Sequence, residues 1–383
     1  MTGKFAAGLA RQRLSVTRLT LSDFRCYAFL RLDVEPTPVV LTGPNGAGKT
    51  NILEALSFLA PGRGLRRAKL SEAVRRQSGP EAPWAVAARI ERPDGVQELG
   101  IGREAGTERR LLRLDGRPMR SQSALASVLS VLWLTPAMDR LFSESPGGRR
   151  RFLDRLVLGL DPTHGPRAAA YEHSLRERAR LLRAGQFDPA WLGVLEDSMA
   201  RQGVAMAMAR KDCVERLNQA CAMGIGPFPA ARLAVEGGVE ISLDSLDAEQ
   251  AVTRLRDGLA ASRRHDAESG GAAEGPHRSD LLVRHHQKNL PASQCSTGEQ
   301  KAVLVAIILG QARIQAAVTG LPPVLLLDEV AAHLDRTRRA ALFDELTALA
   351  TQSWLTGTDA DLFEELGSRG QFFHVEDAVV TAA

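Results

Sequence analysis

Long hydrophobic runs are missing from this chain of 383 residues. No run of about 18 apolar residues occurs, so the sequence predicts no membrane-spanning helix. The first residues, MTGKFAAGLARQRL, lack the apolar segment that a secretion signal needs, and we interpret them as a tail. Hydrophobic residues still make up 44% of the chain, which is enough to fill the core of two domains, or of one domain with a large insertion.

Cysteine is scarce, and its spacing excludes the common metal and redox motifs. The chain has four cysteines, which lie far apart and form no C-x-x-C pair: Cys26, Cys213, Cys221 and Cys295. Reduced thiols in a cytosolic protein are the simplest interpretation, because disulfides persist mainly in oxidising compartments. We therefore expect a cytoplasmic protein.

Neither sign of charge is in large excess. Lys and Arg number 49 against 45 Asp and Glu, so the formal net charge is +4 and the pI is about 9.1. This balance favours a polyanionic partner, and arginine, which supplies most of the positive charge, grips phosphate with a fixed fork of donors. A genome-wide bias toward arginine and alanine would give the same composition, so both explanations stay open.

One stretch, Val39 to Ala60, organises the rest of the chain. Its segment GPNGAGKT satisfies the phosphate-loop pattern G-x-x-x-x-G-K-[ST] at Gly43, Gly48, Lys49 and Thr50. Strand-like residues precede the loop, and a predicted helix with one apolar face follows it until Pro61-Gly62. A glycine-rich turn without a ligand would not need Lys and Thr in this register between a strand and a helix.

The residue types of this loop fit the chemistry of a bound nucleotide. Glycines allow successive backbone amides to point at a phosphate, and the helix N-terminus adds its positive dipole end. Lys49 is expected to reach the β- and γ-phosphates, and the Thr50 hydroxyl to hold Mg²⁺. The predicted nucleotide-binding residues here are Gly43, Pro44, Asn45, Gly46, Ala47, Gly48, Lys49, Thr50 and Asn51.

Two acids end the predicted buried strand Val324 to Leu327 in the segment PPVLLLDEV. A carboxylate at the carboxyl end of a strand beside a phosphate loop is well placed to hold Mg²⁺, so Asp328 is the predicted metal-side acid. Glu329 is the predicted base that orients and deprotonates an attacking water. The alternative is a strand that is simply capped by surface acids.

The remaining segments divide by their hydrophobic period. Strands are predicted at Ser15 to Leu21, then up to about Val34, and in an antiparallel meander: Trp84 to Ile90, Gln97 to Gly102 and Arg109 to Leu114. A short helix is predicted around Ser123 to Ser130, followed by the strand SVLWLTP. The basic connector with Arg63, Arg66, Arg67 and Lys69 is either a solvated face or a DNA contact.

From Pro146 the pattern becomes helical, with a long helix predicted from Pro189 to Ala222. A strand pair is predicted around Arg232 to Leu243, then a helix from Ala248 to Ala261, a flexible connector from Asp266 to Pro276, and a strand in HRSDLLVRHH. Sustained heptads are absent from this arm. Farther on, Ser296 and Glu299 form a capping box before an apolar helix.

Four motifs together resemble a known series. GPNGAGKT, STGEQ at Ser296 to Gln300, LLLDE, and HLD at His333 to Asp335 resemble the Walker A, signature, Walker B and D-loop motifs of ABC-type ATPase heads. Within that class, the chain resembles the RecF family of bacterial recombination and replication-repair proteins. The segments LTLSDFRCY, LEALSFLAPGRGLR, LTP with RRRFLD, and GPHRSDL carry this likeness, which covers nearly the whole chain.

The resemblance implies an α/β fold: an ABC-type P-loop ATPase head with an antiparallel β subdomain and an inserted α-helical arm. The expected domains are residues 1–145 (N-terminal lobe of the head), 146–265 (helical arm) and 266–383 (C-terminal lobe of the head). It also implies an ATP-dependent homodimer. In such a dimer Ser296 and Gly298 act in trans on the partner's ATP, and Asp335 lies at the dimer interface.

RecF-like proteins bind duplex and gapped DNA in an ATP-dependent way, hydrolyse ATP slowly, and help to load RecA at single-strand gaps with RecO and RecR. Two departures from the usual ABC motifs favour a protein that hydrolyses ATP slowly, as a switch, over one that turns ATP over rapidly. SVLWLTPAMD has no glutamine at the expected position, and Thr356 and Thr358 stand where many ABC proteins have a switch histidine. The alternatives are the ATP-binding subunit of an ABC transporter and a non-hydrolytic chromosome-maintenance protein.

Overall fold

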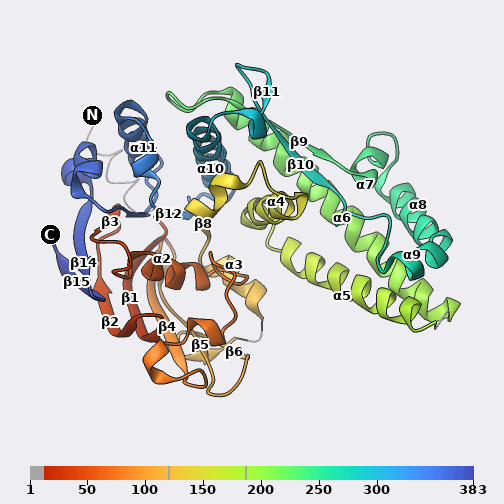
Figure 1. Ribbon diagram of the computed structural model, residues 1–383, viewed down its shortest axis with the longest axis horizontal. Helices are drawn as coiled ribbons and strands as arrows, with labels where there is room; N and C mark the ends of the chain where they lie inside the picture. The colour runs from red at the N-terminus through yellow and green to blue at the C-terminus, as the bar shows by residue number, and fades with distance from the viewer. Residues whose placement is uncertain (1–12, 120, 186–187) are drawn as a thin grey trace. The chain divides into compact units, whose positions relative to one another are not determined.

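The computed structural model describes residues 13–119, 121–185 and 188–383, which fold into two compact units (Figure 1). Unit 1 contains the described residues up to Asp139, together with residues 223–230 and 296–383. Unit 2 contains residues 140–222 and 231–295. The chain thus leaves unit 1 after Asp139, returns to it for residues 223–230, leaves it a second time, and re-enters it at Ser296.

Unit 1 contains a mostly parallel sheet with the strand order β15-β14-β3-β13-β12-β8. The strands are β3 (Val39–Thr42), β8 (Val131–Leu134), β12 (Val324–Leu327), β13 (Ser353–Thr356), β14 (Gln371–Glu376) and, antiparallel at the edge, β15 (Val379–Ala382). The four strands β3, β8, β12 and β13 are buried along their whole length, which explains why their sequences do not alternate between apolar and charged residues. Its helices include α2 (Lys49–Phe58), α3 (Leu125–Val128), α10 (Thr297–Thr319) and α11 (Arg336–Ala348).

A second, antiparallel sheet of unit 1 has the order β2-β1-β4-β5-β6-β7. The strands are β1 (Ser15–Phe24), β2 (Tyr27–Asp33), β4 (Trp84–Arg92), β5 (Gly95–Arg103), β6 (Arg110–Leu114) and β7 (Arg117–Pro118). The predicted meander is confirmed. One face of this sheet joins α2 and the parallel sheet in a single apolar core, where the rings of Phe24, Phe58 and Trp84 meet with centroids 5.3–5.9 Å apart.

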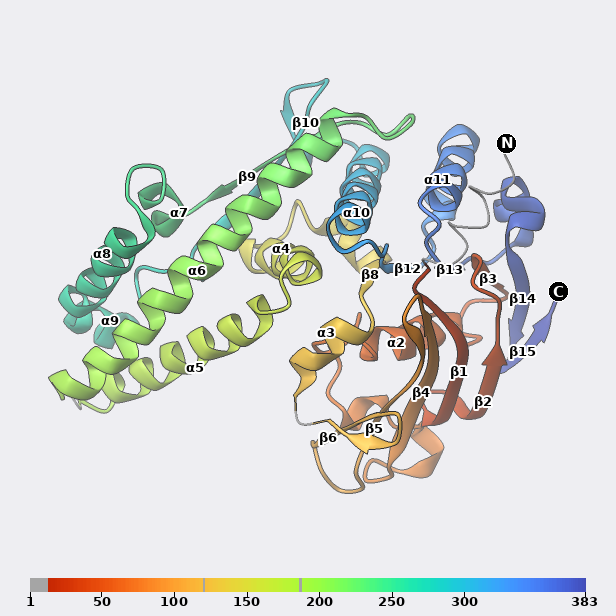
Figure 2. The same cartoon turned by 180° about the vertical axis from the view of Figure 1, so that it is seen from behind.

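Unit 2 is built on long helices, with α5 and α6 side by side in both views (Figures 1 and 2). The helices are α4 (Pro146–Leu160), α5 (His164–Arg183), α6 (Pro189–Ala222), α7 (Gly238–Ser242), α8 (Ala248–Ala261) and α9 (Arg263–Ser269). A small sheet of β9 (Ala231–Glu236), β10 (Asp280–His285) and β11 (Leu290–Pro291) completes the unit. The predicted helices at 189–222 and 248–261 are confirmed.

Two local predictions in this unit are wrong. The second strand expected within residues 232–243 is the helix α7, whose buried Glu240 accepts hydrogen bonds of 2.7 Å from the Ser279 hydroxyl. The expected connector from Asp266 begins inside α9, and Asp266 itself is buried against Arg178. In both places a tertiary polar contact decides the local conformation.

The division into units also differs from the expected domain bounds. Residues 266–295 belong to unit 2 and not to the C-terminal lobe of the head, because β10 pairs with β9 along its length, from Asp280 opposite Glu236 to His285 opposite Ala231. The first crossing lies after Asp139, a few residues before the expected boundary at 145.

The helix α10 is long and apolar enough, by length and composition, to cross a membrane. In this structure 72% of its apolar window is buried inside the protein. A core helix of this kind passes the same test, and Ile307, Ile308 and Leu309 are each at most 1% exposed. The apolar composition of α10 is therefore explained by packing.

Candidate nucleotide-binding site

The phosphate loop has the backbone that its glycines predict. Gly43, Gly46 and Gly48 have φ values of +137°, +84° and +116°, in the region that disfavours side chains. A Cβ on Gly43 would lie 2.1 Å from the carbonyl oxygen of Val375 on β14. Gly43 is therefore required both by its own conformation and by the close approach of a neighbouring strand.

Lys49 is buried at the start of α2, and its ammonium group is held by the loop itself. Its Nζ donates hydrogen bonds to the carbonyl oxygens of Gly43 (2.6 Å) and Pro44 (2.8 Å). Burial lowers the pKa of Lys49, and the negative charges of Glu329 and Asp328 oppose that shift. The structure thus brings the predicted lysine and the two predicted acids into one electrostatic neighbourhood.

Asp328 lies at the carboxyl end of β12 and is 5% exposed. One of its carboxylate oxygens, Oδ1, accepts hydrogen bonds from the hydroxyls of Thr50 (3.0 Å) and Thr356 (2.7 Å). The sheet order explains this meeting, since β13, which ends in Thr356, lies between β3 and β12. The two residues predicted to hold Mg²⁺, Thr50 and Asp328, therefore lie within hydrogen-bond distance of each other.

Glu329 follows directly and leaves the strand. Its φ of +53° is left-handed, and its backbone N–H donates to the Thr356 hydroxyl at 3.0 Å. Thr356 thus connects the backbone of Glu329 with the carboxylate of Asp328. Of the two threonines at the expected histidine position, Thr356 is buried in the site and Thr358 is exposed.

The oxygen atoms at this site fit a Mg²⁺ ion. The Thr50 hydroxyl and the Asp328 carboxylate are hard ligands that already lie 3.0 Å apart. Within residues 13–119, 121–185 and 188–383 no group of three His, Cys, Asp or Glu could hold a metal. A cation with few protein ligands and several phosphate or water ligands is typical of Mg²⁺ at nucleotide sites.

Two residues near the acids were missed by the sequence reasoning. Lys301 on α10 is 1% exposed, and its Nζ lies 3.5 Å from Oδ2 of Asp139. Burial lowers the pKa of Lys301, while Asp139, Glu329 and Asp328 raise it. The only available signal was one lysine inside the apolar run QKAVLVAIILG. Asp139 belongs to the segment SVLWLTPAMD, where no glutamine was found.

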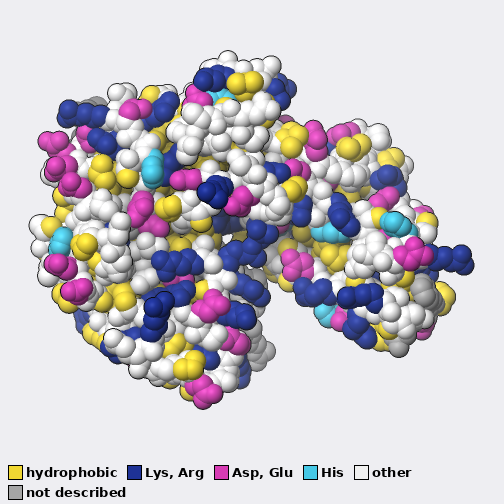
Figure 3. Space-filling view, in the orientation of Figure 1, with side chains coloured by type: hydrophobic (Ala, Val, Ile, Leu, Met, Phe, Trp, Pro, Cys, Tyr) yellow, Lys and Arg dark blue, Asp and Glu magenta, His cyan; other side chains and the backbone are white. Residues whose placement is uncertain are grey.

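Residues beneath the loop form a second polar group. A Cβ on Gly48 would lie 2.6 Å from the Tyr27 hydroxyl and 2.9 Å from the Cys26 sulfur, and Cys26 also accepts a hydrogen bond from Asn51 Nδ2 at 3.1 Å. Arg66 donates to Asn51 Oδ1 (2.7 Å) and to the buried carboxylate of Glu54 (2.8 Å). Figure 3 shows basic side chains on this face of unit 1. Arg66 has a structural role beneath the loop, because its guanidinium binds both Asn51 and Glu54.

The signature and D-loop residues cap helices. Ser296 caps α10 in a capping box with Glu299, so that prediction is confirmed. A Cβ on Gly298 would meet nothing within 4 Å. Asp335 caps α11 by accepting a hydrogen bond of 2.9 Å from the Arg338 amide. In the part of the chain that the structure describes, no hydrogen bond joins Ser296, Gly298 or Asp335 to the phosphate loop.

A parallel sheet with a phosphate loop after β3, two acids at the end of β12, two places along the same sheet, and an adjoining antiparallel sheet define the class of ABC-type ATPase heads. The comparisons with known proteins agree. The family model "RecF/RecN/SMC N terminal domain" matches residues 15–381. The chain therefore belongs to the RecF family, whose curated members carry the name "DNA replication and repair protein RecF".

The relatives cover nearly the whole chain. The RecF protein of Agrobacterium fabrum is 50% identical over 378 residues, which is 97% of this chain and 99% of the relative. That of Allorhizobium ampelinum is 48% identical over 372 residues, 96% of this chain and 98% of the relative. These matches do not favour the transporter alternative.

Solved structures share the fold. The structure "recombination mediator protein RecF-ATPrS in RecFOR pathway" has a TM-score of 0.83 at 21% identity and covers 97% of this chain and 98% of its own. The Smc head domain from Pyrococcus furiosus has a TM-score of 0.56 at 15% identity, with 97% of this chain and 96% of its own covered. The predicted fold class is thus confirmed.

Proposed function

We propose that this chain is an ATP-dependent DNA-binding switch of replication and recombinational repair. The observation that carries the proposal is the Asp328 carboxylate, which accepts hydrogen bonds from Thr50 of the phosphate loop and from Thr356. This arrangement sets a carboxylate and a hydroxyl beside the loop where a nucleotide-bound Mg²⁺ is held in phosphate-loop enzymes. The family assignment adds DNA replication and repair as the setting.

Each residue of the site has a defined part in this proposal. Lys49 exchanges its two carbonyl partners for the β- and γ-phosphates, and the backbone of residues 43–51 surrounds the phosphates. Thr50 and Asp328 hold Mg²⁺, which when bound neutralises phosphate charge. Glu329 orients the attacking water and accepts its proton. Burial lowers the pKa of Lys49, and the charges of Glu329 and Asp328 oppose that shift.

The active form is a homodimer. Each chain has one phosphate loop and one signature segment, and its own Ser296 and Gly298 make no hydrogen bond to that loop within the described residues. The α10 N-terminus, with open space around Gly298, presents a positive dipole end to the γ-phosphate of a second copy. Asp335 lies at the same interface. Slow hydrolysis then releases the two copies from DNA.

The partners follow from the family. A fold relative is described as a recombination mediator in the RecFOR pathway. We accordingly assign this chain to cytoplasmic work with RecO and RecR at DNA gaps, where RecA is loaded. The substrate is duplex DNA at or near a single-strand gap.

The test compares retention of gapped duplex DNA with and without ATP for three proteins. The parent should retain DNA only with ATP. Lys49→Ala should lose this dependence, because it removes the cation that binds the phosphates. Glu329→Gln should bind nucleotide without activating water, and should therefore accumulate as an ATP-bound dimer on a sizing column. A strictly monomeric profile of Glu329→Gln with ATP would contradict the dimer, and unchanged retention by Lys49→Ala would contradict control by the loop.

A further inference from the structure

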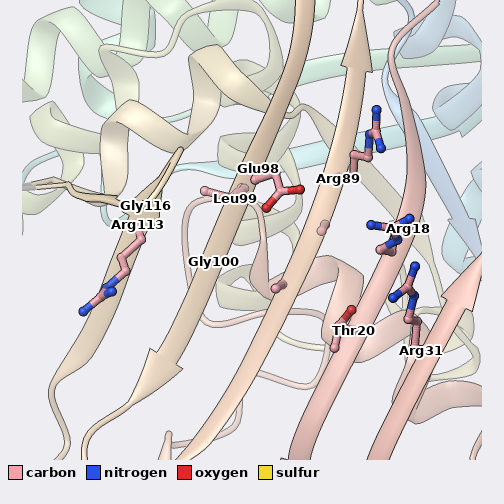
Figure 4. Close-up of a pocket in the computed structure, with 11 residues that line it drawn as sticks. Arg18, Thr20, Arg31, Arg89, Glu98, Leu99, Gly100, Arg113 and Gly116 are labelled. Carbon is pink, nitrogen blue, oxygen red and sulfur yellow. The ribbon is translucent and has the colours of Figure 1, made fainter.

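The solvent face of the antiparallel sheet in unit 1 carries arginines that the nucleotide site does not use (Figure 4). Four of them come from four strands: Arg18 of β1, Arg31 of β2, Arg89 of β4 and Arg113 of β6. Side chains alternate along each strand, and the neighbours of these arginines, such as Leu19, are buried in the core on the other face. The arginines border a hollow of about 350 Å³.

Small side chains form the floor of this hollow. The strand register places Arg31 opposite Thr20, Thr20 opposite Ala87, Ala87 opposite Gly100, and Gly100 opposite Arg113. The two arginines therefore stand at the ends of one row across the sheet, and nothing larger than a threonine lies between them. Neighbouring strands are about 4.8 Å apart, so this row is roughly 19 Å long.

The charge of this face is positive. Asp33 pairs with both Arg18 (2.5 Å) and Arg31 (3.0 Å), and these pairs lower the pKa of Asp33. Among the residues that the structure describes, the side chains of Arg89 and Arg113 form no hydrogen bond or ion pair. The four arginines around the hollow, counted against Glu98 of its lining and the paired Asp33, give a net charge of +2 for these six residues.

We propose that this surface, the arginine face (Arg18, Arg31, Arg89 and Arg113 around Thr20, Ala87 and Gly100), binds the phosphodiester backbone of duplex DNA. Guanidinium groups bind phosphate oxygens with two parallel hydrogen bonds, and the low floor admits a sugar–phosphate strand between them. Among the described residues no aromatic side chain lines the hollow, so its floor offers no platform for stacking of unpaired bases; Phe29, which is 65% exposed, lies beside it on β2. Backbone contacts of this kind are independent of sequence.

This inference rests on the proposed function and names the surface that performs its DNA binding. The experiment measures affinity of the full chain with ATP for a fluorescent duplex over a salt series. Arg89→Ala/Arg113→Ala removes the two guanidinium groups without protein partners. Its affinity should fall about tenfold or more, and the slope of log K against log salt should become shallower by about 2, since each lost phosphate contact removes about 0.9.

A matched pair of variants tests the floor while all arginines are kept. Ala87→Glu places a carboxylate in the middle of the row, and should weaken duplex binding by a similar factor. Ala87→Gln has the same shape without the charge, and should bind as the parent does. Glu98→Gln removes an acid from the rim and should tighten binding. These variants decide the question even if the arginine double variant does not fold.

The outcomes separate this inference from the proposed function. Suppose that the parent retains DNA with ATP, and that Arg89→Ala/Arg113→Ala and Ala87→Glu have the same DNA affinity and salt slope as the parent. This result overturns the inference alone, and the arginine face then binds an acidic protein partner instead of DNA. A parent that binds no DNA overturns the proposed function and the inference together. If these variants lost more affinity for single-stranded DNA than for duplex DNA, the assignment of the face to a duplex backbone would also be contradicted.

Discussion

The hydroxyl of Thr50 donates a hydrogen bond of 3.0 Å to the carboxylate of Asp328, although the two residues lie 278 positions apart in the sequence. The same carboxylate oxygen accepts a bond from Thr356 at the end of the strand between them. Thr50 and Thr356 therefore hold the same oxygen of the acid, one from the loop and one from β13. Thr356 thus joins the end of β13 to the acid that follows β12.

Thr356→Val should damage this arrangement. Valine has the same shape but no hydroxyl, so Asp328, which is 5% exposed, loses a donor and the Glu329 amide loses its acceptor. Leaving buried polar groups unpaired costs about 1–3 kcal/mol. We expect denaturant unfolding to show a loss of that size, and nucleotide affinity to fall. Thr358→Val, at an exposed position, should change neither quantity. Equal stability of the two variants would refute this role of Thr356.

Two glycines of the phosphate loop should differ in their tolerance of alanine. A methyl group at Gly43 would lie 2.1 Å from the Val375 carbonyl oxygen, a backbone atom that cannot move aside without shifting β14. At Gly46 nothing lies within 4 Å, so only the strain of a positive φ remains, about 1–2 kcal/mol. Gly43→Ala should therefore lower the melting temperature much more than Gly46→Ala. Calorimetry checks this order, and the reverse order would contradict the packing described here.

Of the charged residues in unit 2, Arg178 should be the most sensitive to substitution, because its guanidinium is 1% exposed. It donates to Glu196 (3.0 Å), Asp266 (2.7 Å) and the carbonyl oxygen of Leu259 (2.6 Å). Removing one partner of a buried ion pair typically costs about 3–5 kcal/mol, because the remaining charges stay buried.

Arg178→Ala should therefore speed amide hydrogen exchange throughout α5 and α9, measured by mass spectrometry on the full chain. The matched control is Arg180→Ala, two residues along the same helix, which removes an exposed pair with Glu177 (3.0 Å) and should cost less than about 1 kcal/mol. Similar exchange in both variants would show that the buried network contributes little.

Because the Cys213 thiol is buried, we expect the free energy of unfolding to depend on pH in the alkaline range. Burial raises the pKa of its thiol from 9.0 to about 12, with the nearby Asp212 carboxylate adding to the shift. Between these values the folded chain keeps a proton that the unfolded chain releases, so the free energy of unfolding falls as the pH rises from 9.0 to about 12. Below that range Cys213 contributes no pH dependence.

Cys213→Ala should flatten this part of the pH profile, whereas Cys26→Ala, at an exposed cysteine, should keep it. Urea unfolding at about pH 8 and about pH 10 measures the difference between the two conditions. The same decrease in the parent and in Cys213→Ala would assign the effect to other groups.

Local sequence was sufficient for much of the site. Gly43, Gly48, Lys49 and Thr50 are contiguous, and their chemistry depends on the conformation of one loop, so their spacing alone predicts their positions. It was insufficient at residues 237–243, where Val239 and Ile241 favour a strand but the segment forms α7. There the buried contact of Glu240 with Ser279 overrides local propensity, which is a weak determinant for short segments.

What the amino-acid sequence determined by itself is the set of elements and motifs that rest on neighbouring residues: the phosphate loop, the acids after β12 and the caps of α10. Only the tertiary structure decided which distant side chains meet. Thr356 reaches Asp328, and Lys301 reaches Asp139, because of the strand order and the path of α10. Arg31 and Arg113 share one row because of the register of five strands. Strand order and register are set by burial of the whole core, which no local pattern encodes.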